Sequence, residues 1–251
     1  MEITKEKTVA KYVAENIKTA HVFKKFGLDF CCGGNITLEQ ACINNNVDQA
    51  ELEKQLMNVE VNTDRSLDFD SWKLSFLIDH IINVHHSYVK ESLPLISQYS
   101  KKVVEAHSSQ YPYLIEIDKL FHAVSDELMT HLSKEEEVLF PYIKGLESSL
   151  DSVAFNLTSS LDSVVNPIGV MEDEHENAGD VFKKIAKLTN NYKPPAGACN
   201  TFKALYSKLE EFEQDLHHHI HLENNILHPK AIALEENSKT ADGSSVFPSF
   251  L

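Results

Sequence analysis

The chain has 251 residues, enough to bury a sizeable core in one large domain, or in a moderate domain with a smaller companion. Hydrophobic residues make up 42% of it and charged residues 24%, as in ordinary globular proteins. The net charge of −15 argues against binding to nucleic acid or to an anionic membrane surface, because both require clustered lysine and arginine.

The N-terminal segment, residues 1–7, lacks the apolar run of a secretory signal. No uninterrupted apolar stretch approaches the roughly 18 residues that a membrane-spanning helix needs, so no membrane segment is expected. Four cysteines, two of them adjacent, do not make a disulfide framework in a chain of this length. We therefore expect a protein of the reducing cytoplasm.

Residues 1–60 are predicted to form a small helical domain, because apolar residues recur with the helical period and capping-box patterns mark helix starts. Between its short helices lies the motif Asp-Phe-Cys-Cys-Gly-Gly, residues 29–34. Adjacent cysteines are poorly placed to bridge each other, and partly exposed thiols near a helix start are reactive. Cys31 and Cys32 are therefore candidates for thiol chemistry; the alternative is a buried turn of small residues.

Residues 61–68 are polar and are predicted to be a linker. Beyond it, residues 69–236 are predicted to form a four-helix bundle, and residues 237–251, which are rich in serine, a disordered tail. The expected fold is thus all-α, a bundle preceded by a small helical domain. Apolar residues follow the helical period over four long segments, at about residues 70–99, 111–145, 150–190 and 199–235. In the second of these, Val138 is predicted to lie on the inward face with His131 and Glu135.

Two segments of the predicted bundle, residues 131–141 and 219–229, repeat one pattern: His, three residues, Glu, three residues, Leu, one residue, Pro. Each copy follows a further histidine, His86 or His175, at a similar distance. A His and a Glu four residues apart lie on one face of a helix and can bind a common metal centre. The repeat therefore predicts two matching helical hairpins that bury these faces against each other.

The donors of both hairpins would converge in the bundle. A single buried histidine is more often a hydrogen-bonded core residue than a ligand, but two buried carboxylates are very unfavourable without a cation. Structural zinc takes four ligands, usually including cysteine, whereas four imidazoles and two carboxylates suit two bridged ions, with iron favoured and manganese or zinc as alternatives. The predicted metal ligands are His86, His131, Glu135, His175, His219 and Glu223.

Other polar residues crowd the predicted site. His85 is the main rival to His86 as a ligand, and Glu127 and Glu174 are candidates for handling protons near the metal. Most of the remaining histidines are expected to be solvated or to orient ligands through hydrogen bonds. These are His80, His217, His218 and His221.

Taken together, these motifs resemble the repair-of-iron-centres family, which are hemerythrin-like di-iron proteins that restore iron–sulfur clusters damaged by nitric oxide or peroxide. The resemblance runs from about residue 5 to residue 235. It departs from the family in the extra donor His85 and in the polar C-terminal tail. The motifs that carry it are the cysteine motif at 29–34, His86 eight residues before Pro94, His131 with Glu135, Val-Met-Glu-Asp-Glu-His at 170–175 and His-Ile-His-Leu-Glu-Asn-Asn at 219–225.

The resemblance implies that the six predicted ligands bind two iron ions joined by an oxo or hydroxo bridge, with Glu135 and Glu223 as bridging carboxylates. It also places the family's paired cysteines at Cys31 and Cys32. The acidic residues that the family has near its metal fall on Glu127 and Glu174.

We therefore expect a stress-response protein that repairs iron–sulfur clusters after nitrosative and oxidative damage by supplying iron to damaged iron–sulfur proteins. This is a repair role rather than that of a turnover enzyme. Nitric oxide or oxygen species are the expected small ligands, and the family implies a homodimer.

Two other functions would use the same di-iron site. A sensor of nitric oxide or oxygen would bind gas reversibly and would need a signalling partner domain. A nitric oxide or peroxide reductase would turn over its substrate with electrons from an external reductant. Steady-state turnover would favour the reductase, and reversible binding without turnover would favour the sensor.

Overall fold

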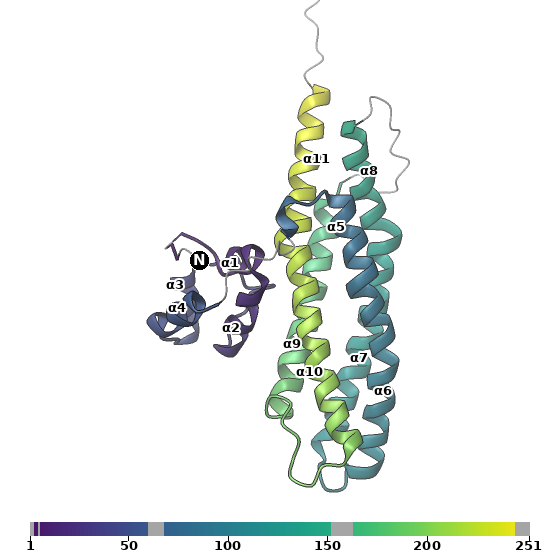
Figure 1. Cartoon of the computed structure of the whole chain (residues 1–251). Helices are drawn as coiled ribbons and strands as arrows, with labels where there is room; N and C mark the ends of the chain where they lie inside the picture. The colour runs from purple at the N-terminus through teal and green to yellow at the C-terminus, as the bar shows by residue number, and fades with distance from the viewer. Residues whose placement is uncertain (1–2, 5, 60–67, 152–162, 244–251) are drawn as a thin grey trace, which may run out of the picture. The chain divides into compact units, whose positions relative to one another are not determined.

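The computed structural model describes residues 3–4, 6–59, 68–151 and 163–243, and the regular elements in these ranges are helices (Figure 1). The all-α prediction is therefore confirmed. Except for Asp68, the predicted linker lies outside the described residues. Among the described helices, none has both the length and the apolar character that crossing a membrane requires.

The chain divides into two compact units. The first consists of residues 1–77, 143–158 and 220–251, and the second of residues 78–142 and 159–219.

Short helices with polar caps build the N-terminal part of the first unit. The Thr37 hydroxyl accepts a hydrogen bond from the backbone N–H of Gln40 at 3.2 Å, and Asp48 caps the following helix in the same way. Both predicted capping sites therefore start helices. Tyr12, Phe23 and several leucines fill the core between them. The elements are α1 (Val9–Glu15), η1 (Ile17–Thr19), α2 (Ala20–Lys25), α3 (Leu38–Asn45) and α4 (Gln49–Met57).

The rest of the first unit contains η2 (Phe69–Ser71), the start of α5 (Leu74–His80), most of α8 (Phe140–Asp151) and α11 (His228–Gly243). The carboxylate of Glu147 accepts hydrogen bonds from the backbone N–H groups of Leu74 and Ser75, at 2.8 and 2.9 Å. An anion at these unpaired donors stabilises the start of α5.

Four long helices make up the second unit, and Figure 1 shows them running lengthwise beside one another. They belong to α6 (Ser87–His107), α7 (Tyr113–Lys134), α9 (Val165–Leu188) and α10 (Asn200–Leu222). Each has one apolar face, which is why they pack as a bundle. Phe121, Phe182 and Phe212 are fully buried between them, and the rings of Phe182 and Phe212 stack at a centroid distance of 5.4 Å.

Several helix boundaries differ from the sequence prediction; for example, α8 continues to Asp151 rather than ending near residue 145. The first bundle helix continues to His107 rather than stopping near residue 99, with Pro94 inside it. The predicted disordered tail is wrong for residues 237–243, because α11 continues to Gly243. Lys239 pairs with Glu235 one turn earlier, at 2.9 Å, and supports this polar extension. Residues 152–162, which were predicted to be helical, lie outside the described part of the chain.

Three π-helical segments interrupt the bundle helices: η3 (Ile81–His86), η4 (Glu135–Leu139) and η5 (Glu223–Leu227). In η4 the N–H of Phe140 reaches back to the carbonyl of Glu135, a five-residue bond. In η5 the N–H of His228 bonds to the carbonyl of Glu223 in the same way. A proline follows each of these donors, and its missing N–H removes the next α-helical bond. The repeated proline therefore accounts for the repeated π segment.

The π segments also shift the buried face. A regular helical period points Val138 into the core, but Val138 is 40% exposed while Leu139 and Phe140 are buried. The prediction that Val138 lines the interior is therefore wrong, because the wider turn in η4 rotates the residues that follow Glu135.

Candidate metal centre

Every bundle helix contributes at least one of the predicted ligands, and all six residues are at most 2% exposed. His131, His175 and His219 lie on the regular helices α7, α9 and α10. The other three lie at the edges of π segments: His86 ends η3, Glu135 begins η4 and Glu223 begins η5. π segments inside α-helices occur frequently at functional sites.

The four histidines face one another in two pairs. Nε2 of His86 lies 3.1 Å from Nε2 of His219, and Nε2 of His131 lies 2.9 Å from Nε2 of His175. Two imidazole nitrogens each about 2.1 Å from one metal ion, with a right angle between the bonds, are about 3.0 Å apart. Both pairs therefore have the spacing of ligands that share one cation.

The carboxylate of Glu135 lies between the two pairs. Its Oε2 is 3.4 Å from Nε2 of His86, and its Oε1 is 3.4 Å from Nε2 of His131, so each oxygen faces a different pair. Glu223 lies one helical turn after His219. The residues form two groups, and within each group the potential ligand atoms all lie within 4.8 Å of one another. The first group is His86, Glu135, His219 and Glu223. The second is His131, Glu135, His175 and Glu223, so both groups share the two glutamates.

The far side of one imidazole in each pair is held by a carboxylate. Nδ1 of His86 donates a hydrogen bond to Glu136 at 2.7 Å, and Nδ1 of His131 donates to Glu174 at 2.9 Å. This fixes the tautomer, so that Nε2 carries a lone pair directed at the partner imidazole. Nε2 of His86 and Nε2 of His131 can therefore act as metal ligands, and the donor set of four imidazoles and two carboxylates fits a metal.

A lysine completes each of these arrangements. Lys90 binds both oxygens of Glu136 at 2.7 and 2.8 Å, and Lys134 binds Glu174. Partial burial opposes ionisation of Glu136, but the hydrogen bonds from Lys90 and His86 outweigh it, so the pKa of Glu136 is lowered. The pKa of Glu174 is lowered by the corresponding bonds from Lys134 and His131. Both carboxylates therefore stay ionised near neutral pH.

The other residues predicted near the metal differ in how close the structure places them to the ligands. Glu174 contacts His131 on the side away from its ligand nitrogen, and Glu127 is exposed on α7. His85 is buried beside His86, but its Nδ1 donates to Asp215 at 2.9 Å and it belongs to neither group of ligand atoms. Glu136, Lys90 and Lys134 were not among the residues predicted from the sequence. The available signal was a lysine one turn after His86 and another one turn after His131.

The cysteine motif forms a tight loop. Oδ1 of Asp29 accepts hydrogen bonds from the backbone N–H groups of Cys31 and Cys32, at 3.0 and 3.1 Å. A Cβ atom on Gly34 would lie 2.4 Å from the carbonyl oxygen of Phe30, so glycine is required there. Both cysteines are free; Cys31 is buried and Cys32 is half-buried.

The two thiols are not equivalent. A hydrogen bond with Cys32, burial and the nearby carboxylate of Asp29 together raise the pKa of Cys31 well above its ordinary value. Cys31 is therefore a protonated thiol near neutral pH, and its burial agrees with the alternative of a buried turn rather than with a partly exposed thiol. Cys32 keeps access to solvent, and its sulfur lies 3.9 Å from Nδ2 of Asn224, the residue after Glu223.

Two further contacts join this loop to η5 and the end of α10 within the first unit. Nδ2 of Asn225 donates to the carbonyl oxygen of Cys31 at 2.9 Å. The ring of Phe30 meets that of His221 edge-on, at a centroid distance of 6.0 Å. Burial lowers the pKa of His221 to about 4, so this imidazole is neutral. The cysteine loop thus contacts the helical turn that carries Glu223.

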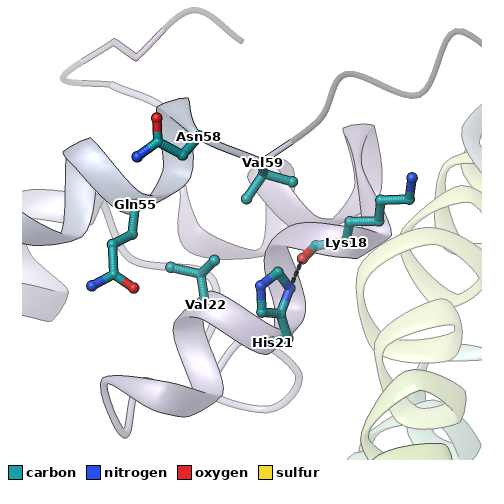
Figure 2. A pocket seen from close by; sticks show the side chains of 6 residues that line it. All are labelled: Lys18, His21, Val22, Gln55, Asn58 and Val59. Carbon is teal, nitrogen blue, oxygen red and sulfur yellow. Dashed lines mark hydrogen bonds between the residues drawn. The ribbon is translucent and has the colours of Figure 1, made fainter.

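The N-terminal part of the chain also has a surface hollow of ≈500 Å³ (Figure 2). In it, Nδ1 of His21 donates to the carbonyl oxygen of Lys18. Neither the cysteines nor the predicted metal ligands line this hollow, so it is separate from the site described above. Its lining residues are Lys18, His21, Val22, Gln55, Asn58 and Val59.

Comparison with known proteins assigns both parts of the chain. Residues 77–231 match the hemerythrin HHE cation-binding domain, and residues 5–60 match ScdA_N, a domain of unknown function (DUF542). A Haemophilus influenzae protein named "Probable iron-sulfur cluster repair protein" is 40% identical over 84% of this chain and 90% of its own length.

Two further relatives carry the same description. The iron-sulfur cluster repair protein YtfE of an Enterobacter species is 36% identical over 87% of this chain and 93% of its own length. The iron-sulfur cluster repair protein ScdA of Staphylococcus haemolyticus is 29% identical over 91% of this chain and 99% of its own length. The chain therefore belongs to the hemerythrin-like family of iron–sulfur cluster repair proteins.

Proposed function

We propose that the protein binds two iron ions in its bundle and supplies iron to repair iron–sulfur clusters damaged by nitrosative or oxidative stress. The observation that carries this proposal is the position of Glu135, whose two oxygens each lie 3.4 Å from a different histidine pair. A buried carboxylate shared in this way suits a pair of cations better than one ion. The names of the curated relatives support the repair role.

In this proposal, His86 and His219 hold one ion, His131 and His175 hold the other, and Glu135 and Glu223 are shared. Two imidazoles with a carboxylate oxygen form the donor set of non-haem ferrous sites that keep open positions. Iron bound there would serve as releasable cargo and would leave positions for nitric oxide or oxygen species. Neutral imidazoles favour release, because they bind the ion without adding charge.

The surrounding residues would control how firmly the ligands are held. Glu136 and Glu174 keep His86 and His131 in the tautomer that presents Nε2 to the ion. Glu174 is the better supported of the two predicted proton-handling residues, because it contacts a ligand histidine directly. Glu127 is exposed, so a proton role for it would act at the protein surface.

Cys32 is our candidate for the thiol that receives iron on its way out. Its sulfur is close to Asn224, the neighbour of the shared ligand Glu223, and it is the more accessible of the two thiols. Cys31 stays protonated and is hydrogen bonded with Cys32, so it can support the neighbouring thiol. The two cysteines would then have different roles: Cys32 would accept iron, and Cys31 would support Cys32.

The expected clients are damaged iron–sulfur proteins of the cytoplasm, and a homodimer remains part of the proposal. The sensor and reductase alternatives would use the same six ligands. The curated relatives compared here carry repair names, which favours the repair function over both.

The test combines iron analysis with a repair assay on a purified iron–sulfur dehydratase that has been inactivated with nitric oxide. The wild-type protein should carry two irons per chain and restore dehydratase activity. Cys32→Ser should keep the iron and lose most of the repair, whereas Cys199→Ser, a change at an exposed cysteine outside the cysteine motif, should keep both. Repair that does not depend on bound iron would contradict the proposed role of the metal. Unchanged repair by Cys32→Ser would contradict the proposed role of the thiol.

A further inference from the structure

A second group of histidines lies outside the two ligand groups, and the proposed function does not use it. His80 ends α5, His85 lies in η3, and Asp215 and His218 lie on α10. All four belong to the same compact unit, and we call them the outer histidine cluster. The ring of His85 meets those of His80 and His218 edge-on, at centroid distances of 5.7 and 5.0 Å.

His85 is held in the same way as the buttressed ligand histidines. Its Nδ1 donates to Oδ1 of Asp215 at 2.9 Å, as Nδ1 of His131 donates to Glu174 at 2.9 Å. The hydrogen bond leaves a lone pair on Nε2 of His85. This nitrogen is buried, in a residue that is only 2% exposed, and has no hydrogen-bond partner among the residues that the structure describes. A buried acceptor without a donor is a position that a cation would stabilise.

The rings of His85 and His218 approach each other about as closely as the rings of one ligand pair. Their ring centroids are 5.0 Å apart, against 4.9 Å for His86 with His219. Oδ2 of Asp215 is buried and likewise has no hydrogen-bond partner among the described residues. Burial and the neighbouring His85 lower the pKa of His80, so this imidazole is neutral at physiological pH and able to bind a metal.

We propose that His85 and His218, with His80 and Asp215 beside them, form an outer binding site for a divalent transition-metal ion. The inner groups are the two places in the described structure where several donors lie within 4.8 Å. The donor atoms of the outer site are therefore farther apart, and we expect this site to bind a metal ion more weakly than the inner centre does.

The position of the outer cluster gives it a role in iron traffic. The ring of His85 lies parallel to that of His219, with an interplanar angle of 6° and a centroid distance of 5.6 Å. His85 and His218 are also the chain neighbours of His86 and His219. An ion at the outer site would be close to the inner ligands. We therefore infer that the outer site binds iron transiently as it enters or leaves the centre. This second inference rests on the proposed function.

The site itself can be tested by titrating the iron-loaded protein with Zn²⁺ in an anaerobic calorimeter. The wild type should bind one further ion per chain, and His218→Ala and His85→Gln should each weaken this binding at least tenfold. His122→Ala is the matched control, because His122 is an exposed histidine with a carboxylate, Asp118, at 3.5 Å. Iron content and thermal unfolding of each variant show whether its inner centre is intact, and His80→Ala provides a variant farther from the ligands.

Binding of no further ion by the wild type, or equal Zn²⁺ binding in wild type, His218→Ala and His85→Gln, would contradict the proposed outer site.

The role of the outer site in iron traffic is tested by the rate at which a ferrous chelator removes iron. That rate should fall several-fold in His218→Ala at unchanged iron content, and an unchanged rate would overturn the role in traffic. Failure of the proposed function would look different, because the wild type would then bind Zn²⁺ at the outer site but repair no cluster.

Discussion

Replacing Glu136 by glutamine tests whether the carboxylates behind the ligand histidines control metal affinity. Glutamine keeps the shape of the side chain and its hydrogen-bonding ability, but removes the charge. Nδ1 of His86 would lose a charge-assisted hydrogen bond of 2.7 Å, and Lys90 would lose its ionic partner. Because an ionised acceptor makes the imidazole a stronger donor to metal, the affinity at one ion should fall.

The size of the effect follows from where each group lies. Losing a partner of this kind typically weakens metal binding about 10- to 100-fold, or about 1.4 to 2.7 kcal/mol. The side chain of Lys90 is 41% exposed, so its ion pair with Glu136 contributes about 1 kcal/mol or less. Lys90→Met should therefore weaken binding no more than about fivefold. Glu137→Gln, at an exposed neighbouring position, should have no effect.

The assay is a competition between the apoprotein and a ferrous chelator of known affinity, followed by absorbance under anaerobic conditions. Glu136→Gln should weaken one of the two binding steps, and Glu174→Gln the other. Thermal unfolding of the metal-free variants checks that they are folded. Equal iron affinity in Glu136→Gln and Glu137→Gln would show that the reasoning is wrong.

Three further predictions concern the buried carboxylate, the cysteine loop and the two thiols. Glu135→Gln should lose metal but raise the unfolding temperature of the metal-free protein, because it removes a buried charge; a lower temperature would contradict this. Gly34→Ala should destabilise the N-terminal domain in thermal unfolding by more than Gly33→Ala, because the added Cβ would meet Phe30 at 2.4 Å rather than Asp29 at 3.3 Å. At pH 8, iodoacetamide should alkylate Cys32 and spare Cys31, whose raised pKa and burial keep it protonated and covered until the protein unfolds. Mass spectrometry of the labelled peptides would show equal labelling if this assignment were wrong.

The sequence was sufficient to predict the all-α fold and to select six residues that the structure brings together. Both follow from periodicity: apolar residues recur with the helical turn, and a His and Glu four apart share a face. The repeated pattern at 131–141 and 219–229 carried the most information, because it applied the same rule twice. It could not show that each proline would produce a π segment beside the glutamate, and so it placed Val138 on the wrong face.

Contacts between helices were beyond the reach of this reasoning. Glu136 meets His86 from a different helix, and Asp215 meets His85 across 130 residues of sequence. Such contacts depend on how each helix is rotated about its axis, which local spacing does not determine. The burial of Cys31 was missed for a similar reason, since it depends on how the loop at 29–34 packs within its unit.

The most direct test of the central claim is the number of iron ions per chain in protein purified without oxygen from iron-replete cells, with iron and protein measured in the same sample. Two irons in the wild type, falling to fewer than one in Glu135→Ala, are the predicted result. One iron in the wild type, or two in both proteins, would contradict a paired centre that shares Glu135.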